Sequence, residues 1–207
     1  MTVDTNVRRD GPRSKRKLIL SVAIDHFGKV GYEHTKWASI AGEVGIGQTA
    51  LYHYFESKAH CLLTIMKLEL ADSLERFDDA TEGLSDPAEA LKAAIGASLA
   101  ASPTDALQRR ILQNHMDLLA TERQSVKEEA ERLECRDLVH RIEVNWTALI
   151  ARGIESGKFA DSDPTLSARL VLALVISVWR WYRPDGKMTI DDITTLVSDA
   201  ALRVVRK

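Results

Sequence analysis

Cysteine, proline, glycine and aromatic residues are all scarce in this chain of 207 residues, which has 2 cysteines, 5 prolines, 11 glycines and 6% aromatic residues. The two cysteines, Cys61 and Cys135, lie far apart, and no histidine partner stands at the spacing of a zinc ligand. This pattern argues against a disulfide scaffold and against a metal site, and it is typical of a protein of the reducing cytoplasm. We expect no cofactor.

Long apolar runs are also lacking. No run reaches the roughly 18 residues that a membrane-spanning helix needs. The stretch 1–17 is basic, but no apolar segment follows it, so it does not have the pattern of a secretory signal. We therefore expect a cytoplasmic protein without a membrane partner.

Helical spacing of apolar residues recurs along almost the whole chain, while runs of β-branched residues are short. This combination predicts an all-α protein. A first helix is expected at about 14–30, because Leu18, Ile19, Val22 and Phe27 share one face and Gly31 follows as a terminator. Further helices are expected at about 57–80, 87–101, 104–121, 124–156, 164–183 and 191–205.

The segment 34–58, HTKWASIAGEVGIGQTALYHYFESK, predicts two short helices joined by a turn. Its apolar positions are spaced so that two crossing helices can bury a small common core. Gly45 falls in the turn, where a positive φ is expected and glycine adopts it without strain. The second helix then presents Gln48, Thr49, Tyr52 and His53 outward. A polar helix face propped on a companion helix suits the major groove of DNA.

Eight positions and pairs in this region resemble, in order and spacing, the N-terminal pattern of the TetR family of transcriptional regulators. They are Phe27, Gly31-Tyr32, Thr35, Ile40-Ala41, Gly45-Ile46, Leu51-Tyr52, Tyr54-Phe55 and Ser57-Lys58. Two positions depart from the family. Gly47 replaces the usual serine or threonine that opens the recognition helix, and Thr49 stands where glycine or proline is common. A glycine is still an acceptable N-cap, so these changes point to an unusual base preference.

The resemblance implies a three-helix helix-turn-helix domain at 14–60, preceded by a flexible basic arm at 1–13. A helical effector-binding and dimerisation domain follows at 61–207. It also implies a homodimer on double-stranded operator DNA and a small-molecule effector. We expect Gln48, Thr49 and His53 to reach base edges. The other expected DNA contacts are Thr35, Lys36, Trp37, Gly47, Tyr52, Tyr54 and Lys58, mainly on the phosphate backbone. Trp37 has two open interpretations, either against that backbone or covering the first helix.

The distribution of charge agrees with a DNA partner, although the net charge of −2 alone does not. Residues 1–60 hold nine Lys and Arg against six acidic side chains, a charge of +3 that leaves −5 for the rest of the chain. Six of the nine bases fall between Arg8 and Lys17. Alone, this arm is a solvated tail. Beside a helix-turn-helix it can neutralise phosphates or enter a minor groove.

The expected helix at 164–183 is apolar nearly all round and must therefore be covered on every side. Packing within its own subunit and against a second subunit meets that requirement, with Leu170–Val178 as the expected seam. Trp179–Arg183 at its end has two interpretations. Aromatic and arginine residues are typical of interfaces, but they also suit a pocket for an anionic, partly apolar ligand. The run from Trp181 to Gly186 resembles one in TetR-type repressors that respond to acyl-coenzyme A thioesters.

An effector cavity is expected between the helices near 104–121, 124–156 and 164–183. Candidate lining residues are His115, Asn145, Trp146 and Trp179, and Arg180 is a candidate partner for an anionic group. We expect a hydrophobic acid or its coenzyme A thioester.

Two other classes of function compete with a ligand-responsive repressor. An α-helical enzyme lacks support, because the sequence shows no nucleophile–base set, metal spacing or phosphate-binding loop. A helical scaffold that binds only proteins leaves the Gln48–His53 face and the basic arm without a purpose. The sequence therefore favours a DNA-binding regulator that is not an enzyme.

Overall fold

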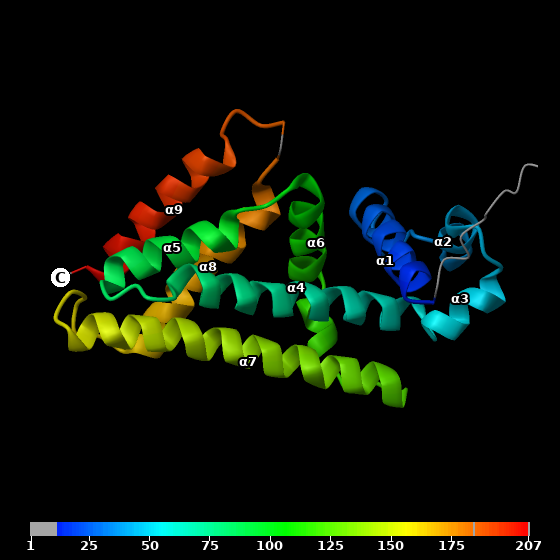
Figure 1. Cartoon of the computed structure of the whole chain (residues 1–207), viewed down its shortest axis with the longest axis horizontal. Helices are drawn as coiled ribbons and strands as arrows, with labels where there is room; N and C mark the ends of the chain where they lie inside the picture. The colour runs from blue at the N-terminus through cyan, green and yellow to red at the C-terminus, as the bar shows by residue number, and fades with distance from the viewer. Residues whose placement is uncertain (1–11, 184, 207) are drawn as a thin grey trace, which may run out of the picture. The chain divides into compact units, whose positions relative to one another are not determined.

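The computed structural model describes residues 12–183 and 185–206, and within these ranges the chain is helical without strands (Figure 1). The all-α prediction is confirmed. The elements are α1 Pro12–Lys29, α2 Trp37–Val44, α3 Gln48–Tyr54, α4 Lys58–Thr81, α5 Pro87–Leu99, α6 Pro103–Asn114, the short 3₁₀ helix η1 Met116–Leu119, α7 Val126–Glu155, α8 Pro164–Trp181 and α9 Ile190–Val205.

The basic arm expected at 1–13 lies almost wholly outside the described residues. Its last two positions, Pro12 and Arg13, already belong to α1. The remainder of the chain forms two compact units, which divide between Leu62 and Leu63. The long helix α4 begins in the first unit and continues into the second.

The first unit is built from α1, α2, α3 and the start of α4. α1 packs on α2, and α2 packs on α3. Its core consists of fully buried side chains from each helix, among them Ile19, Ile40, Leu51 and Phe55. Helices as short as α2 and α3 are marginal in water, so this shared core, more than helix propensity, keeps them folded.

The second unit has its own hydrophobic core, to which α5, α7, α8 and α9 all contribute. α8 packs against both α7 and α9, and α5 packs against α9. Trp146 of α7 lies at the centre, with its ring centroid 5.4 Å from that of Phe77 on α4. Side chains of Asp86, Ser102, Ser125, Asp163 and Thr189 cap the starts of five of these helices.

The helix predicted at 104–121 is interrupted at His115. The Nδ1 atom of His115 lies 2.7 Å from the carbonyl oxygen of Ile111, the acceptor that the His115 amide would use in a continuing α-helix. The His115 amide instead donates to Leu112 one residue later, at 3.1 Å. The ring therefore replaces the backbone donor, and α6 gives way to η1. The other helices begin and end within two residues of their predicted bounds.

Gly153 on α7 allows the ring of Phe159 to pack closely against the backbone of this helix. A Cβ atom there would lie 2.0 Å from Cδ2 of Phe159, whose ring is buried in the core. We predict that Gly153→Ala lowers the free energy of unfolding by about 1–3 kcal/mol, because the ring has no room to move aside. Urea unfolding measures the change.

Gly96 on α5 provides the matched control, since a Cβ atom there would meet nothing within 4 Å. Gly96→Ala should leave stability unchanged or raise it by up to about 1 kcal/mol, because alanine is the better helix former. Equal effects of the two substitutions would contradict the packing argument.

Candidate DNA interface and ligand cavity

The turn between α2 and α3 has the geometry that the sequence predicts. Gly45 is left-handed, with φ 72°, and closes α2 as its C-cap. The amide of Ile46 donates to the carbonyl of Ala41 at 3.0 Å, which completes the turn. Gly47 precedes α3 in an extended conformation, as an N-cap without a side chain. Its Cβ position faces open space.

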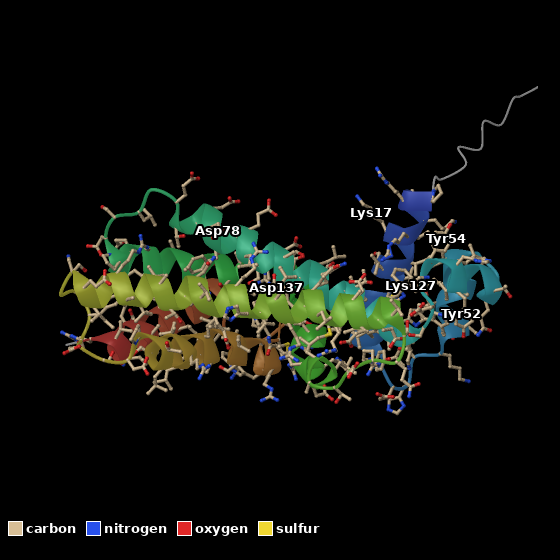
Figure 2. All side chains as sticks on the ribbon, turned by 90° about the horizontal axis from the view of Figure 1, so that it is seen from below. Lys17, Tyr52, Tyr54, Asp78, Lys127 and Asp137 are labelled. Carbon is tan, nitrogen blue, oxygen red and sulfur yellow. The ribbon has the colours of Figure 1, made fainter. Side chains whose placement is uncertain are left out.

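The outer face of α3 is accessible. Gln48, Thr49 and His53 are exposed, and Tyr52 is 47% exposed. Tyr54 is half-buried at the end of the helix, where Figure 2 labels both tyrosines. Gly47 and Lys36 are also exposed. Seven of the ten predicted DNA-contact residues can therefore meet a ligand without rearrangement.

Two of the other three, Thr35 and Trp37, are buried. Thr35 is 4% exposed, and its hydroxyl donates to the carbonyl of Gly31 at 2.8 Å. The indole of Trp37 packs edge-on against Phe55, with ring centroids 6.5 Å apart. Its two interpretations are the DNA backbone and the first helix, but in the structure its ring packs on Phe55, the residue that ends α3. Both residues therefore support the site through buried contacts.

The third, Lys58, was expected to hold a phosphate. Its ammonium instead lies 2.7 Å from the carbonyl oxygen of Tyr32, 3.2 Å from that of Thr35 and 3.4 Å from that of Glu33. It also sits 4.3 Å from the centre of the Tyr32 ring. An ammonium has three donors, and here all three meet the loop before α2. In this structure Lys58 therefore anchors that loop to the first turn of α4.

Two further contacts brace the unit around α3. His26 of α1 and Glu43 of α2 are joined at 2.7 Å between Nε2 and Oε2. The guanidinium of Arg16 on α1 lies 4.3 Å from the centre of the Phe55 ring. Together with the Lys58 anchor, these contacts fix the angle at which the outer face of α3 is presented.

The five predicted effector-binding residues are not gathered at one place. Trp146 and Trp179 are buried in the core of the second unit. Asn145 donates to Asp78 of α4, labelled in Figure 2, at 3.0 Å. Arg180 is exposed, and His115 ends α6. Each is a polar or aromatic residue on a helix with an apolar face. Whether such a residue is buried depends on neighbours that are distant in sequence, so the local pattern does not place it in a site.

A cavity does lie among the predicted helices, with different lining residues. Its volume is about 280 Å³, and residues of α4, α6, η1, α7 and α8 line it. The wall is mostly apolar and includes Leu70, Leu112, Met116, Val139, Ile142, Leu172 and Ile176, with Gln113, Glu143 and Arg169 as its polar members. A small apolar cavity with a few polar groups is typical of ligand sites.

A second hollow of about 460 Å³ adjoins this cavity, since the two share Met116, Val139 and Glu143. Its other lining residues include Arg136 and His140 of α7. The apolar cavity thus has a neighbouring vestibule that contains the guanidinium of Arg136 and the imidazole of His140. The spacing of residues 136, 139, 140 and 143 places them on one helical face, and this pattern could have revealed the site from sequence.

The Trp179–Arg183 cluster is divided between core and surface. Trp179 is buried, whereas Arg180, Trp181 and Arg183 are exposed. Arg110 of α6 donates to the carbonyls of Trp179 and Tyr182, at 3.3 and 2.9 Å, and so fixes the end of α8. None of these residues lines the cavity. The cluster therefore does not contribute to this cavity.

The predicted seam Leu170–Val178 is likewise divided. Val171, Val175 and Val178 face the core of their own unit. Leu170, which is 50% exposed, belongs to a different face of α8. Apolar residues exposed on α8 and α9 are Leu166, Leu170, Ile176, Trp181, Leu196 and Val204. Val175→Glu would therefore place a charge in the core of its own subunit. Its effect would not report on an interface between subunits.

The Lys58 anchor has a testable consequence. We predict that Lys58→Ala destabilises the first unit by about 1–2 kcal/mol, because three carbonyls lose a charged donor. Hydrogen exchange at the amides of 37–55 should accelerate accordingly. Lys36→Ala is the matched control, because Lys36 is exposed in the same loop. It should leave exchange unchanged, and equal exchange in both variants would contradict the anchor.

Within residues 12–183 and 185–206, no helix is both long and apolar enough to span a membrane. Over the same described part of the chain, His, Cys, Asp and Glu do not assemble into a group of three that could hold a metal ion. The two cysteines are both buried thiols. Burial raises the pKa of the Cys135 thiol to about 12, so it is a packing residue at neutral pH.

Two family profiles match the chain. "Bacterial regulatory proteins, tetR family" matches residues 19–65, and "Tetracyclin repressor-like, C-terminal domain" matches residues 84–205. The HTH-type transcriptional repressor KstR2 of Rhodococcus jostii is 28% identical over 185 residues, which are 88% of this chain and 87% of that protein. The HTH-type transcriptional regulator RutR of Escherichia coli is 30% identical over 160 residues, 77% of this chain and 71% of its own length.

Solved structures share the fold. The ketosteroid transcriptional regulator KstR2 of Mycobacterium tuberculosis has a TM-score of 0.79 at 26% identity, covering 93% of this chain and 95% of that one. The TetR-family regulator PfmR of Thermus thermophilus has 0.75 at 30% identity, covering 89% and 97%. AibR, solved with isovaleryl coenzyme A and operator DNA, has 0.77 at 19% identity, covering 90% and 97%. At that identity the last likeness concerns the fold alone.

Proposed function

Because the chain belongs to the TetR family of bacterial transcriptional regulators, we propose that it represses transcription as a homodimer on a near-palindromic operator. In this proposal, a hydrophobic acid or its coenzyme A thioester releases it. The observation that carries the proposal is the polar outer face of α3, which is exposed while the rest of the helix is held by a buried core. The protein is a DNA-binding helix-turn-helix regulator and not an enzyme.

We assign base reading to α3 and backbone contact to its surroundings. Gln48, Thr49 and His53 carry donors and acceptors suited to base edges in the major groove. Lys36, at the N-cap of α2, is an exposed cation and suits a phosphate. Thr35, Trp37 and Lys58 act indirectly, by holding the loop and helices that present these groups.

This assignment is tested on an operator that is selected from the DNA upstream of the protein's own gene or from random sequence. We predict that Gln48→Ala changes the preferred base at one position of each half-site, at a cost of about 1–3 kcal/mol. Lys36→Ala should weaken all sequences alike and reduce the slope of log affinity against log salt by about 0.9 per lost contact. Uniform weakening by Gln48→Ala would refute the base-reading role.

The homodimer follows from the size of the reading surface. One seven-residue recognition helix covers only a short half-site, so two copies related by twofold symmetry are needed for useful specificity. Their half-sites would lie ~34–36 Å apart, one helical turn, or somewhat more. We assign the interface to the exposed apolar faces of α8 and α9, around Leu170 and Leu196, which water otherwise covers.

Leu170→Glu tests this interface, because it places a charge on the exposed face and leaves the core of the subunit intact. We predict a folded monomer that has lost operator binding, measured by sedimentation and by gel shift. Thr165→Glu is the control, since Thr165 is exposed on α8 but on another side of the helix. It should remain dimeric. A wild type that is monomeric at micromolar concentration would rule out the arrangement.

The effector assignment rests on the cavity and its vestibule. The apolar wall suits an acyl or alicyclic group, and the adjoining Arg136, His140 and Arg169 suit a carboxylate or phosphate. The regulator KstR2, which shares this fold at 26% identity, carries "ketosteroid" in its description. That name agrees with an apolar, alicyclic ligand.

A thermal-shift screen of fatty, aromatic and steroid acids and their coenzyme A thioesters identifies the class, and release of the operator confirms it. We predict that Arg136→Ala weakens a thioester effector at least tenfold. Arg141→Ala, an exposed arginine of α7 outside the cavity and vestibule, should leave its affinity unchanged. If only a neutral or cationic compound releases the operator, the effector class is wrong and the repressor assignment stands.

A further inference from the structure

Three charged side chains meet inside the second unit. Glu69 of α4 and Arg109 of α6 are each only 4% exposed. The Nε atom of Arg109 donates to Oε1 of Glu69 at 3.0 Å, and Nη2 of Arg76 donates to the same oxygen at 2.7 Å. Burial raises the pKa of the Glu69 carboxyl against the opposing effect of both arginines. Such a site costs free energy to build, so its position in the fold requires explanation.

Arg109 fastens α6 to more than one neighbour. Its Nη1 donates to the carbonyl of Ser98 at the end of α5, at 2.9 Å. The guanidinium carbon lies 4.8 Å from the centre of the Trp179 ring on α8. The next residue, Arg110, binds the carbonyls at the end of α8. Glu69 is the acidic partner that ties this assembly to α4.

The pair lies beside the ligand cavity. Glu69 directly precedes Leu70, the α4 residue in the cavity wall, and Arg109 precedes Leu112 and Gln113, the α6 residues in the wall, by about one turn. The ion pair therefore connects two helices that both contribute side chains to the cavity wall. It is a buried polar link between α6 and α4, the helix that begins at Lys58.

We propose that the Glu69–Arg109 pair is the positioning contact that converts occupancy of the cavity into movement of α4. An occupant that displaces α6 could leave α4 in place only by separating two buried charges. Arg109 would then lose its carboxylate partner, and Glu69 would keep only the half-buried Arg76. The two helices therefore move together. Because α4 enters the first unit and carries the Lys58 anchor, its movement changes how α3 is presented.

This inference rests on the proposed function and adds the residues that transmit the signal. A merely structural role predicts loss of stability alone. A transmitting role predicts that operator affinity becomes insensitive to what fills the cavity, even in a variant that folds and binds DNA. The two roles are therefore distinguished by the coupling free energy between occupancy of the cavity and binding of the operator, and not by the free energy of unfolding.

The test uses a substitution as the occupant, so it needs no identified effector. Val139→Trp adds an indole at the boundary of cavity and vestibule. Glu69→Met combined with Arg109→Met removes both buried charges at similar length and leaves only Arg76, whose side chain is 28% exposed, without its carboxylate. Operator affinity is measured with and without Val139→Trp in the wild-type background and in this double-methionine background, with thermal unfolding as a check of folding.

We expect Val139→Trp to weaken operator binding at least tenfold in the wild type and less than threefold in the double-methionine background. Arg110→Met is the matched control, because Arg110 contacts α8 and not Glu69. In that background the tenfold effect should persist. If the double-methionine protein does not fold, Glu69→Gln replaces it, and the same loss of sensitivity is expected.

An equal effect of Val139→Trp in the wild-type and double-methionine backgrounds would overturn the inference. It would also fall if Val139→Trp left operator affinity unchanged in the wild type, because the cavity would then send no signal for the pair to transmit. Failure of the proposed function is recognised separately, since the unsubstituted protein would then bind no selected operator.

Discussion

A seven-residue helix makes too few internal hydrogen bonds to persist by itself, and this constraint governs the whole first unit. α3 exists because Leu51 and the following Phe55 are buried against α1 and α2. Those contacts also decide which side of α3 faces outward. The side chains proposed to read DNA are thus exposed and are not needed for packing. Thr35, Trp37 and Lys58 instead make contacts within the unit that stabilise it. Recognition depends on this division of roles.

The second unit satisfies a different constraint, since it must be stable and yet leave room inside. Its core joins α5, α7, α8 and α9 through fully buried apolar side chains. The cavity lies to one side, where α6 ends at His115 and η1 continues at a different pitch. Buried charges and helix-end arginines reinforce the helices around it. Empty space and costly polar contacts therefore occur together, as is expected where a ligand shifts an equilibrium between two arrangements.

Helix α4 is the element on which both units depend. Its first residue, Lys58, binds the loop before α2, and Glu69, eleven positions further on, binds Arg109 beside the cavity. An uninterrupted hydrogen-bonded helix is stiff over this length. A ligand that favours one placement of α4 over another would consequently alter operator affinity, and by linkage the operator would alter the affinity for the ligand.

The sequence by itself determined the helices apart from the break at His115, the turn at Gly45, the outward polar face of α3 and the family, because these depend on local periodicity, capping and glycine conformation. It did not determine the direction of a side chain that can pack against more than one helix. Lys58 met carbonyls of a loop far back in the chain, Val175 faced its own core, and Trp146 packed on Phe77. The cavity wall likewise draws on five helical segments. Such contacts arise from long-range packing, and only the tertiary structure fixes them.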